Sequence, residues 1–196
     1  WLAGQGKDYE TPNRADCSYV QNGMPEGLHQ TTWCTDQALQ FMESAKRYSL
    51  PWFFSLNYFD PHHPFDPPAE YLERYLDKLD ELPLPDYLEG ELEEKPIFQR
   101  IDHRGAYDTP GNFAYDDMTQ RDHRMVRAAY YAMIDMIDQQ VGRLLDWLEE
   151  NGQLENTLII FTSDHGENLG DHGMYLKGPY FYEQNVHVPL LIAMPG

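Results

Sequence analysis

Residues 124–162 decide the fold class, and they read RMVRAAYYAMIDMIDQQVGRLLDWLEENGQLENTLIIFT. From 124 to 150 the apolar side chains recur at helical spacing, and Gly152 follows as a C-terminal stop signal. This part therefore predicts a long amphipathic helix. From 157 to 162 the run is short, apolar and β-branched, without polar alternation, which is typical of a strand covered on both faces.

Two further apolar runs of strand length lie on either side of this segment. Strands separated by a long helix predict an α/β fold, with a mostly parallel sheet sandwiched by helices. We expect three neighbouring strands whose C-terminal ends share one edge, at 52–58, 157–162 and 188–194. The helix at 124–150 is expected to pack across this sheet.

The remainder of the chain is less regular. The first thirty residues are predicted to be mostly loop, because glycines and prolines interrupt them. A helix is expected from a cap at Thr35 or Asp36 to about Ser49, ahead of Pro51. Residues 69–122 form an acidic, loop-rich excursion, and such a run of like charges is expected to be solvated.

Composition limits the function classes. The chain has 196 residues, 41% of them hydrophobic, which suffices for one sizeable core. Its 14 Lys and Arg against 33 Asp and Glu give a formal charge of -19. This balance argues against binding to nucleic acid or to an anionic membrane, because neutralising phosphates requires clustered cations. No run approaches the ~20 apolar residues of a membrane helix, so no membrane insertion is expected.

The compartment stays open at this stage. The sequence begins at Trp1 without an initiator Met or a leader, so any targeting segment is expected outside these residues. Two cysteines, Cys17 and Cys34, do not decide the redox environment.

Two polar clusters follow predicted strands, at 60–66 and 163–173. Ligands of α/β sheets collect outside the carboxyl ends of strands, so both clusters are candidate sites. Asp164 and His165 offer a carboxylate and an imidazole, a combination that suits a hard divalent cation. The alternative is that Asp164 caps a turn and His165 only makes a hydrogen bond.

Three other side chains are candidates for chemistry. Lys177 lies among aromatic residues in a segment poor in other cations and is suited to hold an anionic group. The alternative is a surface lysine whose stem lies on Tyr175 or Tyr180. His62 and His63 are adjacent on a proline-rich loop, where two histidines can equally be exposed and without a role.

The order and the flanks of these clusters match a known family. The motifs are His62-x-Pro64-Phe65, the helix end at 137–145, Thr162-Ser163-Asp164-His165-Gly166-Glu167, Gly170-Asp171-His172-Gly173, Lys177-Gly178-Pro179 and His187-Val188-Pro189-Leu190. In this order they resemble the type I sulfatases of the alkaline-phosphatase-like superfamily, over about residues 31–196.

The resemblance implies a role for each matching residue. Asp164 would be a ligand of a divalent cation, usually Ca²⁺, and His165 a ligand or near-ligand. Lys177 would bind a sulfate oxygen and help to hold the nucleophile, and His62 would contact the sulfate and protonate the leaving oxygen. These four side chains are therefore expected to converge on one pocket. The remaining polar residues of the motifs are expected to be structural or supporting: His63, Glu167 and His172.

The sequence also departs from the family pattern. The family's nucleophile is a formylglycine made from the cysteine of Cys-x-Pro-x-Arg. Neither Cys17 nor Cys34 lies in that motif, and the version of the motif with serine is missing as well. The paired-acid motif that completes the metal site is missing too. We therefore expect residues 1–196 to be part of a single sulfatase catalytic domain that lacks its N-terminal portion and nucleophile. Such a piece would be inactive alone and would bind metal poorly.

The implied activity is a sulfuric-ester hydrolase acting on a small-molecule or saccharide sulfate ester. One alternative is a phosphonate or phosphate ester hydrolase of the same superfamily, which shares the Asp-His-Gly and Lys elements. Another is a catalytically inactive binding protein with the same fold. The resemblance also implies a periplasmic or extracellular location.

Overall fold

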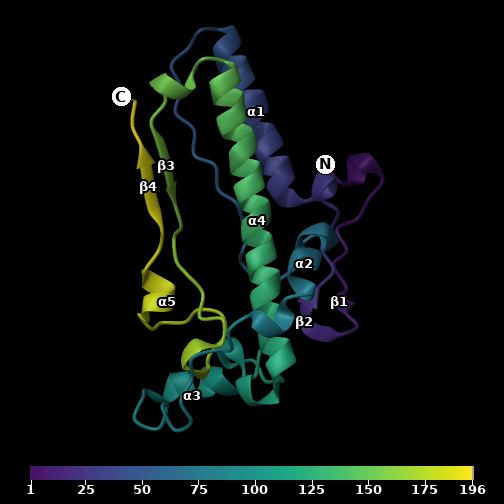
Figure 1. Ribbon diagram of the computed structural model, residues 1–196, viewed down its shortest axis with the longest axis vertical. Coiled ribbons are helices and arrows are strands. Elements are labelled where there is room, and N and C mark those ends of the chain that lie inside the picture. The colour runs from purple at the N-terminus through teal and green to yellow at the C-terminus, as the bar shows by residue number, and fades with distance from the viewer. Residues whose placement is uncertain (196) are drawn as a thin grey trace. The chain divides into compact units, whose positions relative to one another are not determined.

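The longest element is the helix α4, Gln120–Glu150, drawn in green in Figure 1. The predicted long helix is confirmed, and it begins slightly earlier than expected. Thr119 and Asp122 explain this start. The Asp122 amide donates to the Thr119 hydroxyl at 3.2 Å, and the Thr119 amide donates to the Asp122 carboxylate at 2.9 Å. At the other end Gly152 has a φ of +62°, the left-handed conformation that commonly terminates helices.

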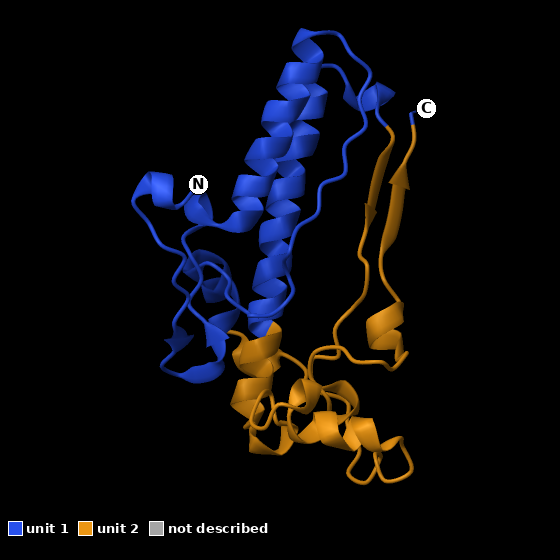
Figure 2. Cartoon of the chain, turned by 180° about the vertical axis from the view of Figure 1, so that it is seen from behind, with its two compact units in different colours: residues 1–76, 128–157, 195–196 blue, residues 77–127, 158–194 orange. Residues whose placement is uncertain are grey.

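The computed structural model describes residues 1–195, which form two units. Figure 2 colours unit 1 blue, residues 1–76, 128–157 and Pro195, and unit 2 orange, residues 77–127 and 158–194. The helix α4 contributes its first part to unit 2 and the rest to unit 1. The assignment of residues 1–196 to a single catalytic domain stays a prediction.

Unit 1 contains two long helices side by side, α1 (Gln30–Arg47) and most of α4, as both views show (Figures 1 and 2). The Arg143 guanidinium of α4 donates to the Asp36 carboxylate of α1 at 2.7 Å. Most of the side chains that this part of α4 buries are small or flexible, namely Ala128, Ala129, Ala132, Met133 and Met136. Alanines permit close helix packing, and methionines fill the gaps that remain.

The start of α1 differs from the prediction. The helix begins at Gln30, and its N-cap is His29, whose ring accepts a hydrogen bond from the Thr31 amide at 3.3 Å. The expected cap at Thr35 or Asp36 is therefore wrong. The prediction failed because the buried positions in the first turns of α1 are polar, namely Thr31, Thr32 and Thr35. Buried threonines conceal the helical period of apolar residues that marks a helix in sequence.

The remaining elements of unit 1 are short. Strands β1 (Asn13–Arg14) and β2 (Cys17–Gln21) pair antiparallel. The strand predicted at 52–58 is wrong, because this segment forms no strand in the described part of the chain. An apolar run becomes a strand only when a neighbour completes its backbone hydrogen bonds, and here Phe53 is 89% exposed.

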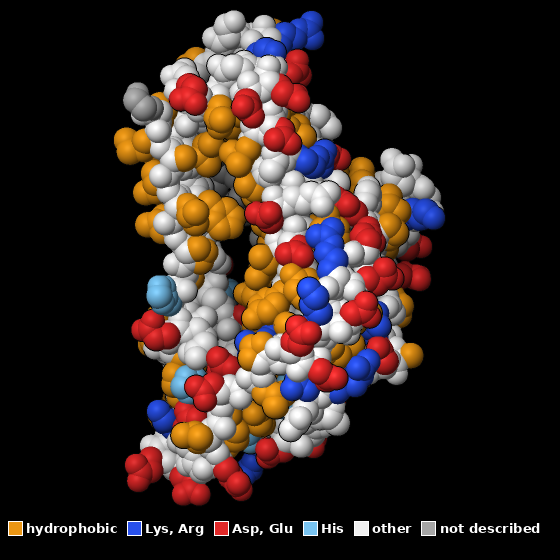
Figure 3. Space-filling view, in the orientation of Figure 1, with side chains coloured by type: hydrophobic (Ala, Val, Ile, Leu, Met, Phe, Trp, Pro, Cys, Tyr) orange, Lys and Arg blue, Asp and Glu red, His pale blue; other side chains and the backbone are white. Residues whose placement is uncertain are grey.

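Unit 2 contains the second strand pair, β3 (Ile159–Thr162) and β4 (Leu190–Ala193). The two pair antiparallel, with Ile159 opposite Ala193 and Thr162 opposite Leu190. The expected parallel arrangement with a shared C-terminal edge is therefore wrong for these strands. Hydropathy reports which faces are apolar and not the direction of a strand, so the sequence pattern could not distinguish the two arrangements. Apolar side chains run along this pair on the face seen in Figure 3.

The acidic excursion at 69–122 contains two helices that the sequence did not predict. The helix α2 (Ala69–Leu76) belongs to unit 1, where the Tyr71 hydroxyl donates to Gln139 Oε1 at 2.8 Å. The helix α3 (Ile97–Arg104) belongs to unit 2. Short 3-10 turns connect the rest, η3 (Leu79–Glu81), η4 (Ala106–Asp108) and η5 (Tyr115–Asp117). None of the described helices has the length and apolar composition needed to cross a membrane.

Candidate active site

Three of the four predicted site residues lie in unit 2, in the segment that leaves β3. Within it, the Ser163 hydroxyl donates to the His165 carbonyl at 2.7 Å, and the Gly166 amide donates to the Asn185 carbonyl at 2.8 Å. The second bond ties the segment to the short helix α5, Glu183–Val186. A Cβ atom on Gly166 would lie 1.9 Å from the Gln184 carbonyl oxygen, so only glycine permits this approach.

Asp164 and His165 present a carboxylate and an imidazole to the same region. His165 Nε2 lies 3.7 Å from Asp164 Oδ2, and the Asp164 side chain is 87% exposed. The His165 amide donates to Asp164 Oδ1 at 3.0 Å. One oxygen of this carboxylate therefore has the turn-capping role, which was the alternative to a metal ligand. Oδ2 and Nε2 are close enough for one cation to contact both. Because a hard cation takes six or more oxygen ligands, these two residues fit part of a metal site.

Lys177 ends the same segment, and its ammonium is buried. Among the described residues its Nζ has no hydrogen-bond partner. Burial lowers the pKa of Lys177, while the carboxylates of Glu167 and Asp164 oppose that decrease. A surface lysine would keep its ammonium in water, whereas the Nζ of Lys177 is buried. A buried ammonium without a hydrogen-bond partner is unfavourable. An anion would supply the missing partner.

Glu167 is the group that sequence reasoning left without an active role. Burial raises its pKa to about 7, and backbone hydrogen bonds and the charge of Lys177 oppose the increase. A carboxyl that titrates near neutrality beside a lysine with a lowered pKa is typical of functional sites. Because pKa perturbation depends on burial, the tripeptide motif alone could not have indicated it.

The position of Lys177 is fixed by the residues before it. Met174, Tyr175 and Leu176 are all buried. The Asn168 side-chain amide donates to the Leu176 carbonyl at 2.8 Å. Leu176 also has a φ of +61°, a left-handed conformation that is unfavourable for a leucine and persists only where the surroundings impose it.

His62 lies in unit 1, where its ring is held on two sides. It stacks on His63 at 4.2 Å between ring centroids and lies 4.7 Å from the Phe59 ring. Its Nδ1 is 2.6 Å from the His63 carbonyl oxygen, so the ring is ordered rather than loosely exposed. The convergence of His62 with Asp164, His165 and Lys177 stays a prediction.

His172 has the structural surroundings expected of it. Its Nδ1 lies 2.5 Å from Glu91 Oε1, and its ring stacks on Tyr182 at 3.9 Å. The contact with Glu91 ties the loop that carries Lys177 to the acidic excursion.

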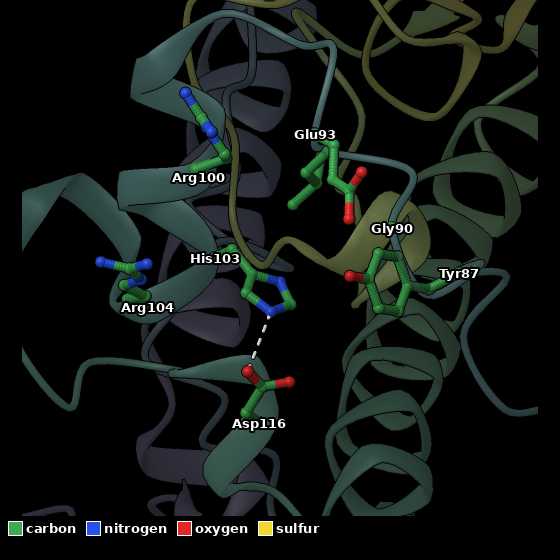
Figure 4. Close-up of a pocket in the computed structure, with 8 residues that line it drawn as sticks. Tyr87, Gly90, Glu93, Arg100, His103, Arg104 and Asp116 are labelled. Atoms are coloured by element: carbon green, nitrogen blue, oxygen red, sulfur yellow. Dashed lines mark ion pairs between the residues drawn. The ribbon is translucent and has the colours of Figure 1, made fainter.

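A pocket of about 240 Å³ lies in unit 2 beside α3. None of the four predicted site residues lines it. Figure 4 shows the His103 ring directed at Asp116, with 3.2 Å between Nε2 and Oδ2, while Arg100 and Arg104 extend away from this pair. Because its walls carry both charge signs and the guanidinium groups do not converge, the pocket is not an anion site.

One group of potential metal ligands was not found from the sequence. His29, Asp60 and Asp66 in unit 1 are all buried, and each offers a ligand atom within 4.8 Å of the others. Burial and the charge of Asp60 raise the pKa of Asp66, while its hydrogen bond with Tyr9 lowers it. Asp60 and Asp66 belong to a polar cluster that the sequence singled out, but His29 is remote in sequence and has no spacing signal.

Comparison with known proteins assigns the chain to a family. A family model described as Sulfatase matches residues 5–196. The chain belongs to the sulfatase family. It is 35% identical to an arylsulfatase of Clostridium perfringens, over 92% of this chain and 36% of that protein. It is 33% identical to the human iduronate 2-sulfatase, over 98% of this chain and 35% of that protein.

A solved structure confirms the fold class. The phosphonate monoester hydrolase SpPMH from Silicibacter pomeroyi matches with a TM-score of 0.77 and 28% identity, over 100% of this chain and 40% of that one. The α/β, alkaline-phosphatase-like class expected from the resemblance is therefore confirmed. This sulfatase chain spans 36% of the arylsulfatase, 35% of the iduronate 2-sulfatase and 40% of the phosphonate monoester hydrolase. Membership implies a divalent metal ion, and the described residues contain one possible His/Asp/Asp ligand group.

Proposed function

We propose that the protein to which this chain belongs hydrolyses sulfate esters. The observation that carries the proposal is the buried Lys177 ammonium without a hydrogen-bond partner among the described residues, near Asp164. A sulfate monoester carries negative charge on its equatorial oxygens throughout the reaction. A preorganised cation in a site sheltered from water stabilises that charge more strongly than water does.

Each residue has a part in this proposal. Lys177 donates hydrogen bonds from its ammonium to a sulfate oxygen and orients the ester. Asp164 and His165 would hold a divalent cation, for which we propose Ca²⁺, and such a cation supplies electrostatic stabilisation of the sulfate when bound. His62 carries the proton that the leaving oxygen requires. The nucleophile is proposed to be a formylglycine outside residues 1–196, since neither cysteine of this chain lies in the required motif.

The substrate proposed is a small-molecule or saccharide sulfate ester. The human relative's name, iduronate 2-sulfatase, indicates a saccharide substrate for that protein. The location that accompanies this proposal is periplasmic or extracellular, and fractionation of cells that express the intact protein tests it.

A second candidate is supported by a specific observation. Two phosphonate monoester hydrolases match this chain, with TM-scores of 0.77 and 0.74. The same ammonium, carboxylate and imidazole would bind a phosphonate or phosphate ester. Comparison of kcat/KM for 4-nitrophenyl sulfate, phenyl phosphonate and phosphate esters by the intact protein distinguishes these reactions. An inactive binding protein would show binding without turnover of any of them.

The test of the site is Lys177→Ala in the intact protein, with Lys78→Ala as the matched control. Lys78 is exposed and belongs to the same unit. Loss of one transition-state donor typically costs about 10²–10³ in kcat. We expect that loss in 4-nitrophenyl sulfate hydrolysis for Lys177→Ala and no change for the control. An unchanged kcat in folded Lys177→Ala would contradict the proposal.

A further inference from the structure

We propose that His29, Asp60 and Asp66 form a binding site for a transition-metal dication, Zn²⁺, within unit 1. The site uses none of the residues that the sulfatase motifs assign to a metal. It is independent of the proposed hydrolase activity.

The geometry of the cluster suits a single ion. One nitrogen of His29 and one oxygen of each carboxylate all lie within 4.8 Å of one another. His29 Nδ1 is 3.5 Å from Asp60 Oδ2, and both side chains are completely buried. Two ligand atoms that each lie about 2.0–2.2 Å from one zinc ion are about 3 to 4 Å apart, which the distance between His29 and Asp60 already matches. The three residues come from the N-cap of α1 and from the proline-rich loop at 60–66.

The charge of the cluster is not balanced by protein cations. In the described part of the chain, neither Asp60 nor Asp66 forms an ion pair with a lysine or arginine. Buried charges are normally paired or bound to a metal, because burial removes the stabilisation that water provides. Two adjacent carboxylates with one imidazole therefore lack a positive partner, which a dication would provide.

The imidazole supplies a second observation. The buried His29 ring accepts the Thr31 amide at Nδ1, so this nitrogen carries a lone pair and no proton. It also lies 3.5 Å from the Asp60 carboxylate, with no proton of the ring between the two atoms. A cation bound between them would relieve the repulsion of these two electron-rich atoms.

The surrounding hydrogen bonds orient the ligands. The Tyr9 hydroxyl donates to Asp66 Oδ2 at 2.6 Å, and Gln30 Nε2 donates to Asp60 Oδ1 at 3.3 Å. The Thr31 hydroxyl also donates to Asp60 Oδ2. Metal-binding carboxylates are commonly held by such outer hydrogen bonds, which fix their orientation.

The donor set favours Zn²⁺ over Ca²⁺. Three buried protein ligands, one of them an imidazole, match the low coordination number and nitrogen and oxygen preference of zinc. Calcium takes six to eight oxygen ligands, which three side chains do not provide.

The test uses the intact protein carrying Asp164→Asn, so that the motif metal site is impaired. After removal of metals with a chelator, ZnCl₂ is titrated by calorimetry, and bound zinc is counted by mass spectrometry. We expect about one Zn²⁺ per chain. Adding Asp66→Asn should weaken zinc binding at least about tenfold, whereas adding Asp8→Asn, an exposed carboxylate in the same unit, should leave it unchanged.

A direct measurement keeps the test valid if Asp66→Asn fails to fold. Crystals of the Asp164→Asn protein soaked in Zn²⁺ should show an anomalous peak at the zinc edge among His29, Asp60 and Asp66. Absence of that peak would overturn the proposal. Zinc affinity unchanged by Asp66→Asn in a folded protein would also overturn it, as would binding of Ca²⁺ without binding of Zn²⁺.

Discussion

Glu167→Gln should change the pH dependence of stability in a direction that the structure fixes. Burial raises the pKa of Glu167 from 4.5 to about 7 in the folded protein. The folded state therefore keeps a proton that the unfolded state has already released between these pH values. Stability then falls as pH rises through this window, because the folded state binds more protons than the unfolded state. Glutamine has no such titration and retains a similar shape.

The magnitude follows from the size of the shift. One pKa unit corresponds to about 1.4 kcal/mol, so the full shift corresponds to about 3 kcal/mol. Part of this loss of stability has already occurred at pH 5, which lies above the pKa of the unfolded state. The free energy of unfolding of Glu167→Gln minus that of the wild type should therefore increase by about 2 to 3 kcal/mol between pH 5 and pH 8.

Urea denaturation of the intact protein at a series of pH values measures this difference. The matched control is Glu94→Gln, an exposed carboxylate of the same unit, whose difference from the wild type should not vary with pH. Parallel pH profiles for Glu167→Gln and the wild type would refute the reasoning. So would an increase of the wild type's stability relative to Glu167→Gln as pH rises.

Three further outcomes are expected. Gly166→Ala should lower the free energy of unfolding by about 1–3 kcal/mol, because its Cβ would lie 1.9 Å from the Gln184 carbonyl oxygen. Thermal unfolding measures this loss, and Gly27→Ala, whose Cβ meets open space, is the control. Thr119→Ala removes the N-cap of α4 and should cost about 1 kcal/mol in urea denaturation, and an unchanged midpoint would exclude the capping role. Asp164→Asn should weaken Ca²⁺ binding at least about tenfold in calorimetry, and equal affinity would remove Asp164 from the ligand set.

The sequence predicted those elements in which local pattern and structure agree. The helix α4 has regular apolar spacing, a cap and a glycine stop, so its existence and its end were predictable. The start of α1 was not, because buried threonines replace the apolar residues there. The segments β3 and β4 were located correctly, but their antiparallel pairing depends on the path of the chain between them.

The candidate site also contains features that the sequence predicted and features that it did not. Asp164, His165 and Lys177 are close in sequence, and the motif that contains them selected them as candidates. Their environment was not predictable, since the burial of the Lys177 ammonium depends on folding around it. The cluster of His29 with Asp60 and Asp66 depends on contacts between remote residues, which single-sequence patterns do not encode.

The strand pair β3 and β4 has a consequence for how this chain behaves in solution. Leu190 is 65% and Ile160 57% exposed, and no charged residue interrupts either strand. In the described residues the pair has two unpaired edges. Exposed apolar strands with free edges can add further strands from other molecules, which is the route to cross-β aggregates. Aggregation of this chain at high concentration should therefore start at 159–162 and 190–193, and a lysine introduced at Leu191 should delay it.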